Sequence, residues 1–142
     1  MQLVTPEQIA AVMALMPAPH SFAELDEQVA DGLPKAALKA GVARMGRNAD
    51  ERREILHRVV PEATLKRRRD RLSASESEKT ERLARVYATA RHVWDSDDDA
   101  LAFLHTPHAM LGGRTPLDVA MTELGARRVE ALLWRLFYGI TA

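Results

Sequence analysis

A dense group of basic side chains lies near the middle of the 142-residue sequence. Five cations fall within six positions and are interrupted only by Asp70. They are Lys66, Arg67, Arg68, Arg69 and Arg71. The surrounding residues 51–92 carry twelve Lys and Arg against seven Asp and Glu, although the whole chain has twenty of each. Positive charge of this density usually binds phosphate or an acidic partner, and a solvated basic helix face explains the composition equally well.

Residues 34–72 predict three short helices with tight breaks at Gly46-Arg47 and at Pro61. The third helix, expected over about residues 61–72, has its polar face filled by arginine and lysine. This layout is typical of a helix-turn-helix DNA reader, in which the first residues of a short helix reach base edges and neighbouring cations bind phosphates. The residues expected to bind DNA are Thr64, Lys66, Arg67, Arg68, Arg69 and Arg71.

The last seven residues, 136–142, carry no charged side chain and include two aromatic residues. Chain termini are usually polar and frayed, so an apolar terminus is expected to be covered by protein. It either packs onto the chain's own core or is covered by a partner. In the second case Phe137, Tyr138 and Ile140 are the expected apolar anchors.

The remaining residue patterns favour neither catalysis nor a metal site. The chain has no cysteine, which excludes thiolate metal sites and cysteine nucleophiles. His105 and His108 flank Pro107, which breaks the helical spacing that paired zinc ligands need. The three carboxylates at residues 97–99 are better explained by the start of a helix, where negative charge is favourable, than by a cation-binding site. We therefore expect no catalytic residue, no cofactor and no metal ion.

The elements that position these residues are predicted to be helices throughout, because apolar residues recur with helical spacing and no strand-like alternation is evident. The clearest apolar stripe runs from Leu83 to Trp94 on a long helix that follows a polar link at residues 73–77. Caps, prolines and glycines mark the other helix boundaries. They are Thr5-Pro6, Ser21, Pro34, Asn48, Pro61, residues 97–99, Thr115-Pro116 and Gly125, of which Gly125 is expected to separate the last two helices.

Three regions follow from this reading: an N-terminal helical extension at residues 1–31, a helix-turn-helix at 32–75, and a long helix with a C-terminal helical domain at 76–142. The first helix has an apolar stripe that could join two copies of the chain. Its members are Ile9, Val12, Met13 and Met16. No apolar run reaches the roughly 18 residues of a membrane span, and residues 1–6 lack the features of a secretory signal, so a cytoplasmic protein without membrane contact is expected.

Short motifs follow one another in order from Gly32 onward, over about three quarters of the chain. They are Thr64-Leu65-Lys66-Arg67-Arg68, Leu72-Ser73-Ala74-Ser75-Glu76-Ser77, Leu83-Ala84-Arg85-Val86, Leu111-Gly112-Gly113-Arg114-Thr115-Pro116-Leu117-Asp118, Gly125-Ala126-Arg127-Arg128-Val129-Glu130 with Leu132-Leu133, and Arg135 with Tyr138-Gly139. With these motifs the sequence resembles the Xre-type antitoxins that carry a C-terminal toxin-binding domain, also called the MbcA/ParS/Xre group.

The resemblance implies an all-α protein in which a helix-turn-helix domain precedes a small helical toxin-binding domain. It implies an antitoxin of a type II toxin–antitoxin pair and not an enzyme. The implied partners are a cognate RES-domain toxin, which degrades NAD, and the operator DNA of the antitoxin's own operon. A homodimer is expected because one helix-turn-helix contacts only a half-site. The residues expected to bind the toxin and block its active site are Arg114, Leu133, Phe137, Tyr138, Gly139 and Ile140.

Two other functions stay open beside this one. The chain could be a plain helix-turn-helix repressor whose C-terminal domain oligomerises or senses a ligand, or a polar-localisation adaptor. Two positions also depart from the family pattern: Lys79 stands where arginine is common, and Phe137 where a polar or acidic residue is frequent. The second change makes the terminal segment more apolar, which would suit a different toxin surface.

Overall fold

A long central helix, α6 (Ala74–Trp94), organises the protein, whose residues 2–139 are described by a computed structural model. A capping box starts this helix: Ser73 Oγ accepts from the Glu76 backbone N–H, and the Glu76 carboxylate accepts from the Ser73 N–H at 2.8 Å. Because α6 begins at Ala74, most of the polar link predicted at residues 73–77 is helical.

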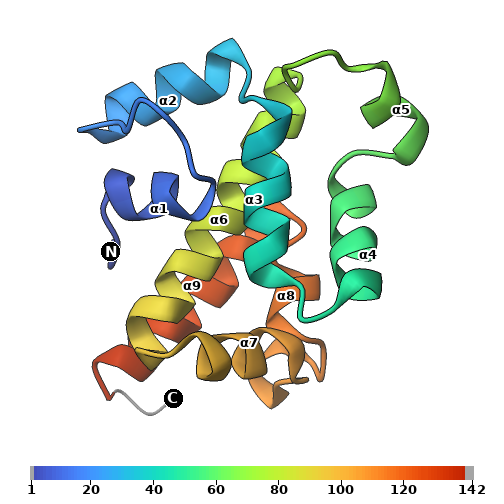
Figure 1. Ribbon diagram of the computed structural model, residues 1–142. Helices are drawn as coiled ribbons and strands as arrows, with labels where there is room; N and C mark the ends of the chain where they lie inside the picture. Colours follow the sequence, from blue (N-terminus) through green and yellow to red (C-terminus); the bar gives the residue numbers. More distant parts are fainter. Residues whose placement is uncertain (1, 140–142) are drawn as a thin grey trace.

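Five helices pack most extensively against α6 (Figure 1). They are α1 (Pro6–Val12), α2 (Phe22–Asp31), α3 (Lys35–Met45), α7 (Asp97–His105) and α9 (Glu123–Phe137). The 3-10 helix η1 (Ala109–Leu111) and α8 (Pro116–Val119) connect α7 to α9. Residues 2–139 contain no β-strand, only isolated bridges between Pro34 and Arg71 and between His108 and Arg114, so the all-α prediction is confirmed. No helix in this part of the chain is long and apolar enough to cross a membrane.

The predicted helix-turn-helix corresponds to α3, α4 (Ala49–Val59) and α5 (Glu62–Arg67). Asn48 caps α4, since its side chain accepts from the Glu51 backbone N–H at 2.9 Å. Pro61 ends the turn after α4 and precedes α5. In Figure 1, α3 lies along α6, whereas α5 lies at the outer edge of the molecule. This arrangement leaves α5 accessible to a partner.

Leu33 joins the two ends of this helix-turn-helix segment. Its carbonyl accepts from the Leu72 N–H at 2.8 Å, and its N–H donates to Ser77 Oγ at 2.8 Å. The adjacent Gly32 has φ +94°, and a Cβ there would lie 2.6 Å from the Leu72 carbonyl oxygen. Glycine is therefore required where the chain enters α3 and leaves the segment toward α6.

The apolar stripe of the first helix is buried in the chain's own core. Ile9, Val12 and Met13 are all at most 5% exposed, and α1 packs against α6, α2 and α3. Met16 alone is exposed, at 82% of its surface. The stripe on which the dimerisation hypothesis depended is thus covered within one chain and is not available to a second copy.

Gly125 lies inside the first turn of α9, so the prediction that it separates two helices is wrong. The boundary is set by Thr122, whose Oγ1 accepts from the Gly125 N–H at 3.0 Å. A Cβ at Gly125 would lie 1.7 Å from the Val119 carbonyl oxygen. The glycine allows the end of α8 to approach the start of α9 closely.

Candidate functional site

The basic group is divided between α5 and the segment that follows it. Lys66 and Arg67 lie exposed on α5, and Arg69 lies exposed after it. Lys66 Nζ is 3.6 Å from Glu62 Oε1, and Arg67 Nη2 donates to Thr64 Oγ1 at 3.3 Å. These four predicted DNA-binding residues, Thr64 included, lie together at the accessible end of the helix-turn-helix segment.

The third helix ends at Arg67, five residues before the predicted end at about residue 72. Arg68 is extended and forms a two-point ion pair with Glu76, with both N–O distances 3.1 Å. Arg71 Nη1 donates to the Gly32 carbonyl oxygen at 2.7 Å. Arg68 and Arg71 are therefore tied to the start of α6 and the start of the helix-turn-helix segment, because the chain must turn back there to pair Leu72 with Leu33.

The Arg68–Glu76 contact also changes the titration of the carboxyl group. Burial acts to raise the pKa of Glu76, but hydrogen bonds from Arg68 and Ser73 outweigh it and hold this pKa below its ordinary value. The hydrogen bond to the Glu76 carboxylate raises the pKa of Arg68. Both groups are therefore charged at neutral pH, and the pair joins the end of the basic segment to the capping box of α6.

The C-terminal residues predicted to bind a toxin fall into two environments. Leu133 is completely buried in the core, so it cannot contact a partner and that prediction is wrong. Phe137 and Tyr138 are 44% and 56% exposed. Gly139 follows with φ +67°, and Ile140 lies outside the described residues.

The exposed end of α9 forms an aromatic surface. The Phe137 ring lies 5.0 Å from both the His92 and the Tyr138 rings, and Tyr138 lies 4.7 Å from Trp134. Leu136 beside them is 41% exposed. Residues 136–138 are thus only partly covered by the chain's own core, which favours a partner as their cover.

Two more exposed apolar side chains, Trp94 and Met110, were missed by sequence reasoning. The sequence placed Trp94 on the buried stripe of α6, yet it is 40% exposed at the last position of that helix. Met110 is 46% exposed in η1. The residue that could have indicated the exposure of Trp94 is Asp95, which follows it directly. Asp95 ends α6 in a left-handed conformation, so Trp94 lies in the last turn of the helix.

Arg114 lies on the side of the C-terminal region that faces the helix-turn-helix segment. Its Nε donates to Asp118 Oδ2 at 2.8 Å, and Arg58 of α4 donates to Asp118 Oδ1 at 2.7 Å. The two arginines, Arg58 first, hold the pKa of Asp118 below its ordinary value. One carboxylate therefore joins α4 to the segment that carries a predicted toxin-binding residue.

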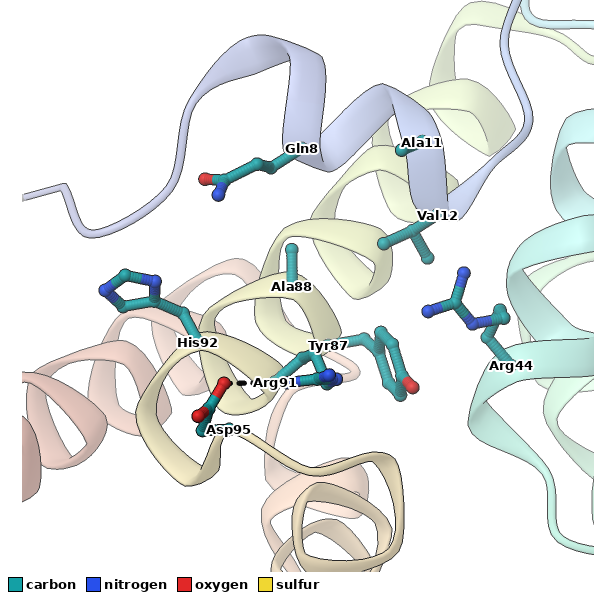
Figure 2. A pocket seen from close by; sticks show the side chains of 9 residues that line it. All are labelled: Gln8, Ala11, Val12, Arg44, Tyr87, Ala88, Arg91, His92 and Asp95. Carbon is teal, nitrogen blue, oxygen red and sulfur yellow. Dashed lines mark hydrogen bonds and ion pairs between the residues drawn. The ribbon is translucent and has the colours of Figure 1, made fainter.

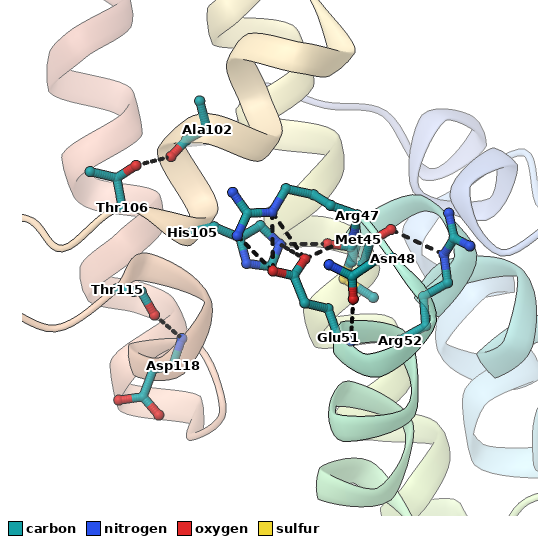
Figure 3. Close-up of polar contacts among 11 residues, drawn as sticks. Met45, Arg47, Asn48, Glu51, Arg52, Ala102, His105, Thr106, Thr115 and Asp118 are labelled. Carbon is teal, nitrogen blue, oxygen red and sulfur yellow. Dashed lines mark hydrogen bonds and ion pairs between the residues drawn. The ribbon is translucent and has the colours of Figure 1, made fainter.

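The histidines considered as metal ligands contact backbone atoms instead. His105 Nε2 lies 2.7 Å from the Met45 carbonyl oxygen at the end of α3 (Figure 3), and His108 Nδ1 accepts from the Met110 N–H at 3.1 Å. No group of three or more His, Asp or Glu side chains within residues 2–139 could hold a metal ion.

A pocket of about 440 Å³ lies between α1, α3 and α6 (Figure 2). The Arg44 guanidinium lies 5.3 Å from the centre of the Tyr87 ring, and Arg91 contacts Asp97 and Asp95 at 2.9 and 3.4 Å. Arg44 also lies 3.9 Å from Asp97. The cations of the pocket are thus compensated by carboxylates, as expected for a structural junction.

Two family models match consecutive parts of the chain. Residues 24–85 match the antitoxin Xre-like helix-turn-helix domain, and residues 89–139 match the antitoxin Xre/MbcA/ParS C-terminal toxin-binding domain. The chain is also similar to an Antitoxin Xre of Yersinia enterocolitica serotype O:8 / biotype 1B, with 36% identity over 92 residues. That match covers 61% of this chain and 62% of the relative, which is less than two thirds of its length. Both matched domains are binding domains and not enzymes, in agreement with the sequence prediction.

Proposed function

The chain belongs to the Xre-type antitoxin family, and from this membership we propose that it is the antitoxin of a type II toxin–antitoxin pair. In this proposal the C-terminal helices bind a cognate RES-type toxin and block access to its NAD-cleaving site. The helix-turn-helix binds the operator and represses the operon, as a homodimer and in the cytoplasm. The domain limits stay as proposed from the sequence, at residues 1–31, 32–75 and 76–142.

The observation that carries the proposal is the exposed aromatic end of α9. Phe137 and Tyr138 lie within the part of the chain that matches the toxin-binding domain, and about half of each side chain is accessible. Aromatic side chains are enriched in the cores of protein interfaces relative to the rest of the surface. With Leu133 excluded by its burial, the proposed toxin contacts are Arg114, Phe137, Tyr138, Gly139 and, outside the described residues, Ile140.

Toxin neutralisation is tested by co-expressing the chain with the product of the neighbouring gene. The double variant Phe137→Asp/Tyr138→Asp should lose growth rescue and co-purification, because two charges would have to be buried against the toxin. Leu124→Asp is the matched control, since Leu124 is 70% exposed at the other end of α9. Equal rescue by both variants would contradict the role of the C-terminal residues, and absence of rescue by the unchanged chain would favour the plain repressor.

DNA binding is proposed to depend on Thr64 and on three accessible cations of the basic group, Lys66, Arg67 and Arg69. Each phosphate contact releases counterions, so Arg67→Ala and Arg69→Ala should each weaken binding to the operon's promoter and reduce the slope of log affinity against log salt by about 1. Arg135→Ala is the control, because Arg135 is an exposed cation in the last turn of α9.

Arg68→Ala separates structure from DNA contact within the same basic group. Arg68 forms a two-point ion pair with Glu76, so its removal should lower the free energy of unfolding by a small amount, because the pair is partly exposed to solvent. Arg69→Ala should leave stability unchanged. Urea unfolding of both variants, measured beside their promoter affinities, checks this; equal stability of the two would contradict the assignment.

A further inference from the structure

A groove of about 360 Å³ opens beside the exposed end of α9. Most of its lining is apolar or aromatic and comes from α6, α7, the segment after α7, and α9. The residues concerned are Trp94, Ala102, Phe103, Pro107, His108 and Leu136. The Trp94 and Phe103 rings lie 5.9 Å apart, and the Phe103 and His108 rings 6.3 Å apart, edge to face. The groove is thus built from packed rings on α6, α7 and the segment after α7, which gives it a defined shape.

Leu136 makes this groove continuous with the proposed toxin surface. It lines the groove and directly precedes Phe137 and Tyr138. All the lining residues fall within residues 89–139, the match to the toxin-binding domain. Partly exposed aromatic and aliphatic side chains around a concavity are typical of the central pockets of protein interfaces.

The rim of the groove carries negative charge. Asp99 lines it, and the exposed Asp95 and Asp98 lie on the same stretch of chain. Asp95 is compensated by Arg91, but the carboxylates of Asp98 and Asp99 form no ion pair within residues 2–139. Residues 93–142 as a whole carry seven acidic against four basic side chains. A partner that fills the groove therefore has to bring positive charge to its edge.

We propose that the groove between α7 and α9 takes one apolar side chain of the toxin, placed next to a lysine or arginine that pairs with Asp99. This inference rests on the proposed function and adds a second anchoring point to the aromatic end of α9. Its occupant is a segment of the toxin surface with an apolar anchor and an adjacent cation.

The test blocks the groove without disturbing the core. Ala102 is exposed on α7, so Ala102→Gln puts a long polar side chain into the groove at a position that tolerates helix formers. The affinity of the Ala102→Gln variant for the product of the neighbouring gene should fall at least about tenfold. Ala36→Gln, the same change at an exposed position of α3, should leave affinity unchanged.

The charge of the rim is tested by a neighbouring pair of carboxylates. Asp99→Asn should weaken binding and reduce its salt dependence, whereas Asp98→Asn, which removes the same charge outside the groove lining, should do so less. Equal effects of the two variants would overturn the proposed pairing with Asp99.

Trp94 provides a local readout of occupancy. The chain has two tryptophans, so a Trp134→Phe variant leaves Trp94 as the single reporter in the antitoxin. Biosynthetic replacement of this tryptophan by 5-hydroxytryptophan, which can be excited at wavelengths where ordinary tryptophan does not absorb, keeps tryptophans of the toxin from contributing. The acrylamide quenching of the label at position 94 should fall when the complex forms. If the complex forms but Trp94 stays equally accessible, or if Ala102→Gln binds normally, this inference is overturned and the proposed function stands.

Two further outcomes also overturn the inference. If the unchanged chain does not bind the product of the neighbouring gene, the proposed function and the inference fall together. If Ala102→Gln instead lowers the mass of the isolated antitoxin in light scattering, a second copy of the chain occupies the groove and the toxin does not.

Discussion

Glu51 stabilises the turn between α3 and α4, where the helix-turn-helix changes direction. Its carboxylate accepts from Arg47 Nη2 at 2.6 Å and from the Arg47 backbone N–H at 2.9 Å (Figure 3). The side-chain hydrogen bond from Arg47 is the main reason that the pKa of Glu51 falls to about 2, from an ordinary value of 4.5. A single side chain thus connects the stability of this turn to pH.

Glu51→Gln should make the free energy of unfolding depend less on pH under acidic conditions. Because the folded pKa lies below the unfolded one, the ionised carboxylate stabilises the fold above about pH 5, and this contribution disappears as the pH falls to about 2. The free energy of unfolding, measured with urea at several pH values in this window, should therefore decline less in the variant. Glu54→Gln, at an exposed position of α4, is the control that should keep the wild-type decline; identical curves for both variants would rule out the Glu51 contribution.

At the scale of elements, α9 combines a structural face and a binding end. Val129, Leu132 and Leu133 are buried against the core, whereas Leu136 and Phe137 are partly exposed one turn later. The same helix therefore carries side chains whose loss should affect stability and side chains whose loss should affect a partner.

Leu133→Ala should lower the free energy of unfolding by about 2–5 kcal/mol, because it removes a completely buried side chain and leaves a cavity. Phe137→Ala should cost less than about 1 kcal/mol, since the ring is only partly covered. Thermal and urea unfolding of the two variants, followed by toxin co-purification with Phe137→Ala, measure both effects. A larger destabilisation by Phe137→Ala would contradict this division of α9.

Local signals in the sequence predicted the starts of most helices. Thr5, Asn48 and Thr115 cap helices where expected, because a cap depends only on residues three or four positions away. The end of α5 was not predictable in this way. After α5 the chain is held in an extended conformation by Lys35, whose backbone N–H donates to the Asp70 carbonyl and whose Nζ donates to the Arg68 carbonyl. These contacts join distant parts of the sequence, so local patterns do not reveal them.

The binding residues were predictable only as groups. Composition located the basic group and the apolar terminus, but it could not separate Arg68, which is held by Glu76, from the exposed Arg69. It likewise could not separate Leu133 from Phe137, because helical spacing shows that an apolar face exists and not which part of it the core covers.

At the scale of the whole molecule, one core serves both matched domains. Buried residues from Val4 to Leu133 form a single hydrophobic cluster around α6, whose sequence runs from one family match into the other. Polar contacts cross the same boundary: Arg85 Nε pairs with Glu130 Oε1 at 2.6 Å and Arg82 Nε with Glu123 Oε2 at 3.1 Å.

Because of this shared core, the chain should unfold in one cooperative transition. Far-ultraviolet circular dichroism reports on all the helices, while tryptophan fluorescence reports on Trp94 and Trp134, near the ends of α6 and α9. The two signals should give the same urea midpoint. Separate midpoints would show that the helix-turn-helix and the C-terminal helices unfold independently.

The position of α6 also limits how such proteins can be recombined. A helix that contacts α1, α2 and α3 as well as α7 and α9 cannot be cut between the two matched domains without exposing apolar surface on both sides. An exchange of the C-terminal half for that of a relative would have to preserve the side chains of α6 that meet it. Toxin specificity is therefore expected to change by substitutions at the surface of the C-terminal helices more readily than by shuffling whole domains.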